Sequence, residues 1–291
     1  MKKILLSVLL LIGLVAKGQD RTDSVRRVID SSIVLLRTYA LHRDRPDWDH
    51  VRERAYELVG QATRWEELGP AISWLFEAVD DHQGGLSVKG TMLQWKRQEP
   101  PYLSEALKEE FAKGARIVRR LLPGGIGYLR IPGMMMGSSG YDEAAGCLLD
   151  SLYALEAEGA RKFIIDLRLN AGGAMSPVIA GLSPLLGNGS PVAILTGHGT
   201  GSAGTCVAVA FKGRKHTWFI GEPTASGATG NVRHPIVAGQ VDIVIAETMF
   251  VDRAHRGYPR NLIPDEWVPG GDDLSDHEKD KKVQAAIRRL N

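Results

Sequence analysis

A serine flanked by glycines stands between two apolar runs in the second half of the chain. The segment reads Gly197-His-Gly-Thr-Gly-Ser-Ala-Gly204. We expect Ser202 at the start of a helix, where free backbone N–H groups can stabilise a developing oxyanion. The segment alone leaves two interpretations open, because a serine at this place can be a nucleophile or a helix cap.

Two further segments combine glycines with groups that can move or stabilise charge. Asp166-Leu-Arg-Leu-Asn-Ala-Gly-Gly173 follows an apolar stretch, and Gly172 and Gly173 permit backbone conformations that direct an N–H group into a cleft. Asp80-Asp-His-Gln-Gly-Gly85 places His82 beside two carboxylates, as in a general base with an orienting acid. Taken singly, the first is equally an ordinary turn and the second a solvated loop.

The elements that must position these residues alternate between strand and helix after residue 123. Apolar stretches predict strands at residues 126–131, 162–167, 191–195 and 217–220, separated by helices at 141–159, 175–186 and 203–212. This alternation is typical of an α/β fold in which helices cover a sheet. Residues 240–246 and 247–251 are expected to form a further pair of strands.

The N-terminal part of the chain has a helical pattern. Apolar residues recur at three- and four-residue spacing between residues 21 and 79, which predicts a small bundle of three helices. We therefore expect four parts: a signal peptide over residues 1–19, an N-terminal α-helical bundle over 20–83, a connecting segment over 84–122 and an α/β core over 123–291.

The first residues indicate export. Lys2 and Lys3 precede an apolar stretch over residues 4–15 that is followed by small residues, which is the layout of a secretory signal peptide. No later apolar run reaches the length of a membrane span. We expect an exported protein, periplasmic or secreted, without a membrane anchor after signal cleavage.

Composition narrows the possible partners. With 44% hydrophobic residues the chain can form a substantial core, and a net charge of +2 without long basic runs argues against nucleic acid as a partner. Cys147 and Cys206 lie in apolar surroundings and are expected to be buried thiols, while a disulfide between them stays open. No spacing of cysteine and histidine is typical of a zinc site, so we expect no metal.

Together, these segments resemble the C-terminal processing proteases, also called tail-specific proteases. The motifs that carry the resemblance follow one another in the family's order: Asp80-Asp81-His82, Asp166 to Gly173, Thr200-Gly-Ser-Ala-Gly-Thr205, Gly221-Glu-Pro-Thr-Ala-Ser226 and Ile263-Pro-Asp-Glu-Trp-Val268. The similarity is to the branch that includes tricorn core domains and retinoid-binding repeats. It implies an α/β fold with a spiral core like that of ClpP and crotonase enzymes.

The resemblance implies a serine peptidase that acts on peptide or protein substrates without a cofactor. It assigns the nucleophile to Ser202 and the general base to His82. The oxyanion hole would consist of the N–H group of Ala203 with that of Gly172 or Gly173.

Substrate recognition is expected to differ from that of many relatives. The connecting segment over residues 84–122 is too short for the peptide-binding PDZ domain of the family. Specificity is therefore expected to reside in the cleft itself.

The general base is a point where the chain departs from part of the family. Gly227 occupies the position of the lysine in members with a Ser–Lys dyad, which favours His82. His198 is a rival, because it lies four residues before Ser202. The acid that orients the histidine stays open among three carboxylates: Asp80, Asp81 and Glu222.

A second departure concerns the residue three positions after the nucleophile. Thr205 stands where the family has an acidic residue. This replacement keeps open a non-catalytic protein that binds a ligand or peptide on the same fold. A hydrolase of small esters or amides is another alternative, because the same serine and histidine would support that chemistry.

Overall fold

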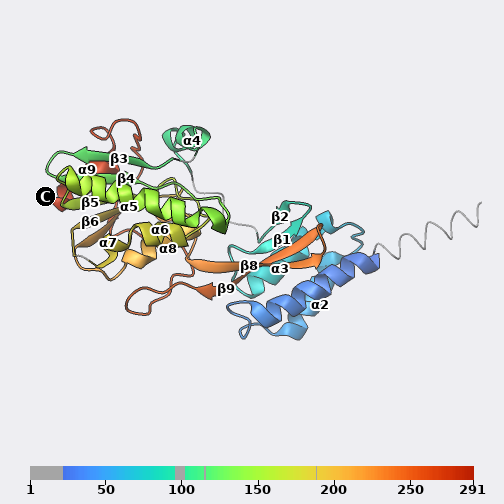
Figure 1. Ribbon diagram of the computed structural model, residues 1–291. Helices are drawn as coiled ribbons and strands as arrows, with labels where there is room; N and C mark the ends of the chain where they lie inside the picture. Colours follow the sequence, from blue (N-terminus) through green and yellow to red (C-terminus); the bar gives the residue numbers. More distant parts are fainter. Residues whose placement is uncertain (1–21, 96–101, 115, 188) are drawn as a thin grey trace, which may run out of the picture. The chain divides into compact units, whose positions relative to one another are not determined.

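The computed structural model describes residues 22–95, 102–114, 116–187 and 189–291 (Figure 1). By its internal contacts the chain divides into two compact units. Unit 1 contains the described residues up to 95 together with 230–248, and unit 2 contains the remainder. The expected signal peptide lies outside the described residues. Among the residues described, no helix is long and apolar enough to cross a membrane.

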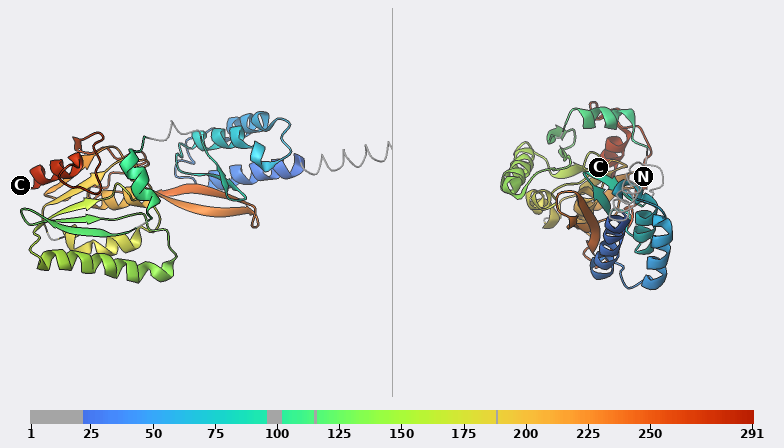
Figure 2. Two further views of the ribbon diagram at one scale, coloured as in Figure 1. Left: turned by 90° about the horizontal axis from the view of Figure 1, so that it is seen from above. Right: turned by 90° about the vertical axis from the view of Figure 1, so that its right-hand side faces the viewer.

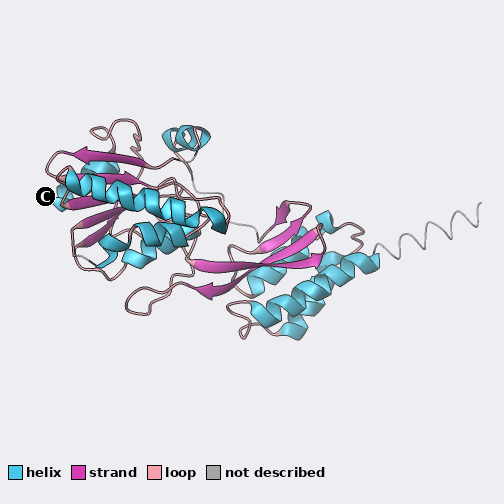
Figure 3. Cartoon of the chain, viewed as in Figure 1, coloured by secondary structure: helices cyan, strands magenta, loops and turns pink. Residues whose placement is uncertain are grey.

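Unit 1 combines three α-helices with a sheet (Figure 3). Residues 22–39 are helical, and α2 (Trp48–Val59) and α3 (Gly69–Ala78) follow, with a short 3-10 helix (Trp65–Glu67) between them. Asp47 begins α2, because its carboxylate accepts hydrogen bonds from the N–H groups of Asp49 and His50. The three helices predicted from the apolar periodicity are confirmed.

The sheet of unit 1 has the strand order β2-β1-β9-β8. Its strands are β1 (Gly85–Val88), β2 (Thr91–Leu93), β8 (Thr229–Val237) and β9 (Val241–Met249). β1 runs antiparallel to both of its neighbours, and Leu86 lies opposite Ile243 of β9. The helices contribute Leu36, Leu75 and Phe76 to one core with these two residues, all fully buried.

Two expectations about unit 1 are wrong. The segment 84–122 is not merely a connection, because residues 85–93 pair into the sheet of unit 1 while α4 (Glu105–Ala112) and β3 (Val118–Leu122) belong to unit 2. The strand pair expected at 240–246 and 247–251 is a single strand, β9, whose neighbour is β8. The N-terminal bundle is therefore covered by a sheet that includes residues 230–248.

Unit 2 contains a six-stranded sheet of order β10-β7-β6-β5-β4-β3. Besides β3, the strands are β4 (Ile126–Arg130), β5 (Lys162–Asp166), β6 (Val192–Thr196), β7 (Thr217–Gly221) and β10 (Glu266–Trp267). All pairs are parallel except β3 with β4. β4, β5 and β6 are buried along their whole length or nearly so, as expected for parallel strands covered on both faces.

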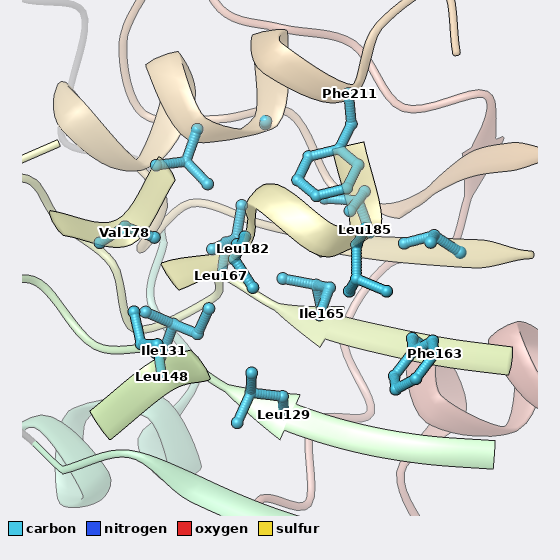
Figure 4. Close-up of a cluster of buried hydrophobic side chains, with 14 of the residues drawn as sticks. Leu129, Ile131, Leu148, Phe163, Ile165, Leu167, Val178, Leu182, Leu185 and Phe211 are labelled. Carbon is cyan, nitrogen blue, oxygen red and sulfur yellow. The ribbon is translucent and has the colours of Figure 1, made fainter. Parts of the chain in front are cut away.

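Helices cover both faces of this sheet (Figure 2, left). One face packs on α5 (Tyr141–Ala157), α6 (Ser176–Gly181), α7 (Ser183–Gly187) and α8 (Ala203–Phe211), which follow a 3-10 helix (Ser138–Gly140). Figure 4 shows part of this core, which includes Leu129, Ile165 and Phe211. The other face packs on α9 (Lys281–Leu290). The single helix expected over 175–186 is divided into α6 and α7.

A buried charge network anchors the C-terminal segment to the end of β5. The fully buried guanidinium of Arg168 donates to the carboxylates of Asp166 (2.7 Å), Asp272 (2.9 Å) and Asp280 (2.7 Å). Burial opposes ionisation of Asp166, but Arg168 and the Tyr128 hydroxyl hold the pKa of this carboxyl below its usual value. Because buried ions need such partners, the network fixes the point at which the chain leaves β5.

Candidate active site

The glycine-rich turn after β6 is fastened to the loop after β5. Thr200 donates its hydroxyl hydrogen to the carbonyl oxygen of Leu167 (2.9 Å) and accepts a hydrogen bond from the N–H group of Gly197 (3.1 Å). The N–H group of Gly201 donates to the carbonyl oxygen of Asn170 (2.9 Å). These bonds hold Ser202 next to the loop that contains the paired glycines.

Ser202 occupies the N-cap position of α8 in a conformation that is rare for a residue with a side chain. Its φ is 49° and its ψ is −117°, outside the extended region in which N-cap residues normally lie. Its hydroxyl makes no capping hydrogen bond, and among the described residues it has no other hydrogen-bond partner. Its own N–H group donates to the hydroxyl oxygen of Ser226 (2.7 Å). The half-buried hydroxyl is therefore available for chemistry, as in the strained turn of a nucleophilic serine.

Gly172 lies directly against the Ser202 side chain. A Cβ atom at Gly172 would be 3.0 Å from the Ser202 Cβ and 3.5 Å from its Oγ, and φ at Gly172 is +131°. Gly173, with φ +100°, passes so close to the Met134 carbonyl oxygen that no side chain fits. Both positions therefore require glycine.

Three backbone N–H groups of the paired glycines and of the residue after Ser202 have no acceptor in the described part of the chain. They belong to Gly172, Gly173 and Ala203. Ala203 is the first residue of α8, so its N–H group is one of those that a helix leaves unbonded. Unbonded donors of this kind can stabilise the negative charge that develops on a carbonyl oxygen by hydrogen bonding to it.

Two threonine hydroxyl groups hold Ser226, the residue that accepts the hydrogen bond from the Ser202 N–H group. The buried Thr205 donates to the carbonyl oxygen of Ser226 (3.0 Å), and Thr224 donates to the same oxygen (2.8 Å). Thr205 therefore acts as an anchor for the residue that accepts the Ser202 N–H group. Ser226 was not singled out by its sequence, although it closes the segment Gly221 to Ser226 that carries part of the resemblance.

His198 and Glu222 also belong to unit 2. Glu222 forms an ion pair with the buried Lys282 ammonium (3.0 Å) and accepts a hydrogen bond from the N–H group of Gly270 (3.2 Å). The His198 Nε2 atom lies 4.0 Å from the Glu222 carboxylate, and its buried Nδ1 atom has no partner in the described residues. Glu222 is thus engaged mainly by Lys282, and it does not hydrogen-bond His198.

His82 lies in a turn of unit 1 that orients its ring. Its Nε2 atom is 2.9 Å from the Asp80 carboxylate, and the ring stacks on Trp95 at 4.3 Å between centroids. Asp80 adopts a positive φ of 53°, which directs its side chain back toward His82. The imidazole remains 42% exposed, so its other nitrogen can be reached by a partner.

The neighbouring Asp81 has a different task. It is 5% exposed, and its carboxylate accepts hydrogen bonds from the N–H groups of Gln83 (2.9 Å), Gly84 (2.7 Å) and Ala246 (2.8 Å). It therefore fastens the turn to β9. Of the three acids left open by the sequence, Asp80 is the one that contacts His82 within unit 1.

The two cysteines are not paired. Cys206 in α8 is buried, and burial raises the pKa of its thiol to about 12. Cys147 in α5 is exposed, so the expectation that both thiols are buried is wrong for this residue.

Comparison with known proteins gives a similarity to one peptidase family over part of the chain. Residues 125–190 match the model of peptidase family S41. A nisin-resistance protein of Lactococcus lactis subsp. lactis is 23% identical over 257 residues, which cover 75% of each protein. A lipoprotein from Streptococcus agalactiae has a similar structure, with a TM-score of 0.65, 17% identity and coverage of 93% of this chain and 96% of that chain.

A second solved structure with this fold is the photosystem II D1 C-terminal processing protease. Its TM-score is 0.59 at 13% identity, over 92% of this chain and 100% of that chain. The segment matched by the family model contains β4, β5 and the loop with Gly172 and Gly173. The chain is thus similar to peptidase family S41 over this segment and has the fold of the processing protease.

Proposed function

We propose that the chain is an exported serine peptidase of family S41 that cleaves peptide bonds through an acyl-enzyme on Ser202, with His82 as the general base. One observation carries the proposal. Ser202 stands at a helix start in a positive-φ conformation, yet its hydroxyl caps nothing and lies against Gly172. A serine that served only as a cap would hydrogen-bond the first turn of α8.

The chemistry follows from the groups around this hydroxyl. The Ser202 Oγ attacks the carbonyl carbon of the scissile bond while His82 accepts its proton, and the carbonyl oxygen becomes an oxyanion. The N–H groups of Ala203 and of Gly172 or Gly173 stabilise that oxygen. His82 then gives the proton to the leaving amine, and water hydrolyses the acyl-enzyme by the same steps.

The choice of His82 over His198 rests on their carboxylate partners. A catalytic imidazole is held in one tautomer by a hydrogen bond from its other nitrogen. His82 has such a bond to Asp80 at 2.9 Å, whereas the His198 Nε2 atom lies 4.0 Å from the Glu222 carboxylate, too far for a hydrogen bond. We assign Asp80 as the orienting acid.

Export is part of the proposal. The first residues have the layout of a signal peptide. The relatives named as a nisin-resistance protein and as a lipoprotein fit an exported protein. Fractionation of cells that express the full chain tests this, because an unprocessed cytoplasmic product would contradict it.

A fluorophosphonate probe tests the catalytic assignment, because it reacts with an activated serine. We expect the wild type to be labelled at Ser202 and Ser202→Ala to remain unlabelled. His82→Ala should slow labelling about 100-fold, and the matched variant His198→Ala should leave the rate nearly unchanged.

The outcomes separate the alternatives. A folded wild-type protein without an adduct on Ser202 would exclude both peptidase and esterase chemistry at this residue. A larger loss in His198→Ala than in His82→Ala would overturn the base assignment alone. Cleavage of a peptide library by the unlabelled wild-type enzyme divides a peptidase from a hydrolase of small esters.

A further inference from the structure

The turn that carries His82 determines which nitrogen of its imidazole can accept a proton. The Nε2 atom lies 2.9 Å from the Asp80 carboxylate, whereas the Nδ1 atom has no hydrogen-bond partner among the described residues. An ionised carboxylate only accepts hydrogen bonds, so Nε2 must carry the hydrogen of the neutral ring. The lone pair of this imidazole is therefore on Nδ1.

Arg45 keeps the carboxylate in the form that selects this tautomer. Its guanidinium lies 3.4 Å from the second carboxylate oxygen of Asp80. A cation at this distance favours the ionised form of a carboxyl group. A protonated Asp80 could instead donate its hydrogen to Nε2 of His82, which would place the ring hydrogen on Nδ1 and remove the lone pair from that atom.

The neighbouring His42 does not disturb this arrangement. Partial burial and the nearby Arg45 hold the pKa of His42 below its ordinary value. Its imidazole is therefore neutral at pH 7 and does not compete with His82 as a charged donor to Asp80.

Trp95 fixes the plane of the His82 ring. Its indole stacks on the imidazole with 4.3 Å between the ring centroids and an angle of 26° between the planes. Trp95 is itself anchored, because it packs against the hydrophobic core of unit 1. The stacked indole restricts the imidazole to one plane, and the bond to Asp80 selects one of the two orientations that this plane allows.

We propose that His82 takes the proton of Ser202 on its Nδ1 atom. Arg45 and Trp95 are then positioning residues that keep this nitrogen available. The inference rests on the proposed function, because it names the atom that acts as the base at that site. The O–H bond of Ser202 breaks, its proton joins the Nδ1 lone pair, and Oγ bonds to the carbonyl carbon while one C–O bonding pair moves to oxygen. Nδ1 later returns the proton to the leaving amine.

A matched pair of methylated histidines tests which atom is the base. The full chain with Asp80→Ala, which makes room beside Nε2, carries either Nδ1-methylhistidine or Nε2-methylhistidine at position 82. The two residues have the same size and differ only in which nitrogen keeps a lone pair. We expect the fluorophosphonate to label Ser202 of the Nε2-methyl variant at the rate of Asp80→Ala itself, and that of the Nδ1-methyl variant about ten-fold more slowly.

Asp80→Asn gives a second test that a purely structural role would not satisfy. Arg45 would bind the amide oxygen of the asparagine, so its NH₂ group would face Nε2 of His82 and favour the tautomer with hydrogen on Nδ1. We expect labelling to slow about 100-fold, because the ring is then held in the wrong tautomer. Asp80→Ala leaves both tautomers accessible and should lose less.

Smaller effects are expected from the positioning residues. Arg45 is 59% exposed, so Arg45→Ala should slow labelling only about three-fold, Arg45→Lys should restore the rate, and Arg45→Ala should add nothing to Asp80→Ala. Trp95→Ala should slow labelling about five-fold, and Trp95→Phe should recover most of it. Arg43→Ala is the matched control, since this exposed arginine of the same turn donates to the carbonyl oxygen of Ala40 and should leave the rate unchanged.

The proposal is overturned if the Nδ1-methyl variant is labelled as fast as the Nε2-methyl variant or faster. It is equally overturned if Asp80→Asn is labelled faster than Asp80→Ala, or if Arg43→Ala slows labelling as much as Arg45→Ala. Failure of the proposed function has a different signature, because Ser202 would then be unlabelled in the wild type or would be labelled equally fast in His82→Ala.

Discussion

Among the described residues of unit 2, Ser104 and Ser202 both occupy the N-cap position of a helix, and they are used in opposite ways. Ser104 precedes α4 with a φ of −60° and a ψ of 153°. Its hydroxyl accepts a hydrogen bond from the N–H group of Leu107 (3.4 Å) and donates to the Asp272 carboxylate (2.8 Å). Ser202 precedes α8 with a φ of 49°, and its hydroxyl does neither.

The difference shows how much stability is lost at Ser202, where the side chain does not cap the helix and the backbone is strained. A capping side chain stabilises a helix by about 1 kcal/mol, and a positive φ at a residue with a side chain costs about 1 to 3 kcal/mol. Contacts outside the helix compensate for both, since Ser226 holds the N–H group of Ser202 and Asn170 holds that of Gly201. Among the described residues the hydroxyl of Ser202 therefore has no hydrogen-bond partner, whereas the hydroxyl of Ser104 both donates and accepts a hydrogen bond.

The largest expected effect follows from removing the free hydroxyl. Ser202→Ala should lower kcat/KM for peptide cleavage by about four to six orders of magnitude. It should leave the free energy of unfolding within about 0.5 kcal/mol, because no hydrogen bond of the hydroxyl is lost. Peptide cleavage assays and urea unfolding measure the two quantities. A variant destabilised by several kcal/mol would show that this serine is structural.

A smaller loss is expected when the donor beside the hydroxyl is displaced. Gly172→Ala places a Cβ atom 3.0 Å from that of Ser202 at a φ of +131°, so the loop must shift and its N–H groups with it. Losing one oxyanion donor lowers kcat by about 100-fold or more. Gly187→Ala is the control, since a Cβ atom there meets nothing within 4 Å. Equal turnover by both variants would separate Gly172 from the chemistry.

The alternation of strand and helix after residue 123 could be predicted because β4 to β7 are short apolar runs between helices of clear periodicity. The sheet of unit 1 could not be predicted from such patterns. β8 contains Pro235 and the charged Arg233, which is tolerated because β8 is an edge strand. β1 pairs with β9 across more than 150 residues of chain, and local patterns contain no trace of such pairing.

The candidate site was predictable to the same depth. The sequence pattern indicated Ser202, Gly172 and His82, because each stands in a motif with glycines or carboxylates. It could not distinguish Asp80 from Asp81, since the two are adjacent and differ only in the direction of their side chains. The role of Ser226 depends on a contact with a residue 24 positions away.

The next expected effect concerns the carboxylate that Ser104 engages. Burial opposes ionisation of Asp272, but Arg168 and Lys282, with the Ser104 hydroxyl, hold the pKa of this carboxyl below its usual value. Asp272→Asn should cost about 2 kcal/mol of stability at pH 7, because two buried cations lose a charged acceptor. Both cations keep other partners, which limits the loss.

The pH dependence gives this prediction its sign. The folded pKa of Asp272 lies below the unfolded value of about 3.9. Its stabilisation is therefore complete above about pH 4 and is lost as the pH falls through the folded pKa. Unfolding curves of wild type and Asp272→Asn should converge in acid. Glu158→Gln, at an exposed pair, should show no such convergence, and a constant difference for Asp272→Asn would contradict the assignment.

The smallest expected effect sharpens the comparison most. Ser104→Ala removes a cap and the hydrogen bond to Asp272, so it should cost about 1 kcal/mol in the free energy of unfolding. The rate of fluorophosphonate labelling at Ser202 should not change, and Ser104→Thr should restore most of the stability because it keeps the hydroxyl. The two alanine variants then have opposite effects: Ser104→Ala lowers stability and keeps the reactivity at Ser202, and Ser202→Ala removes the reactivity and keeps stability. Since both residues are serines at helix starts in one unit, only their backbone conformation and surroundings can account for that exchange.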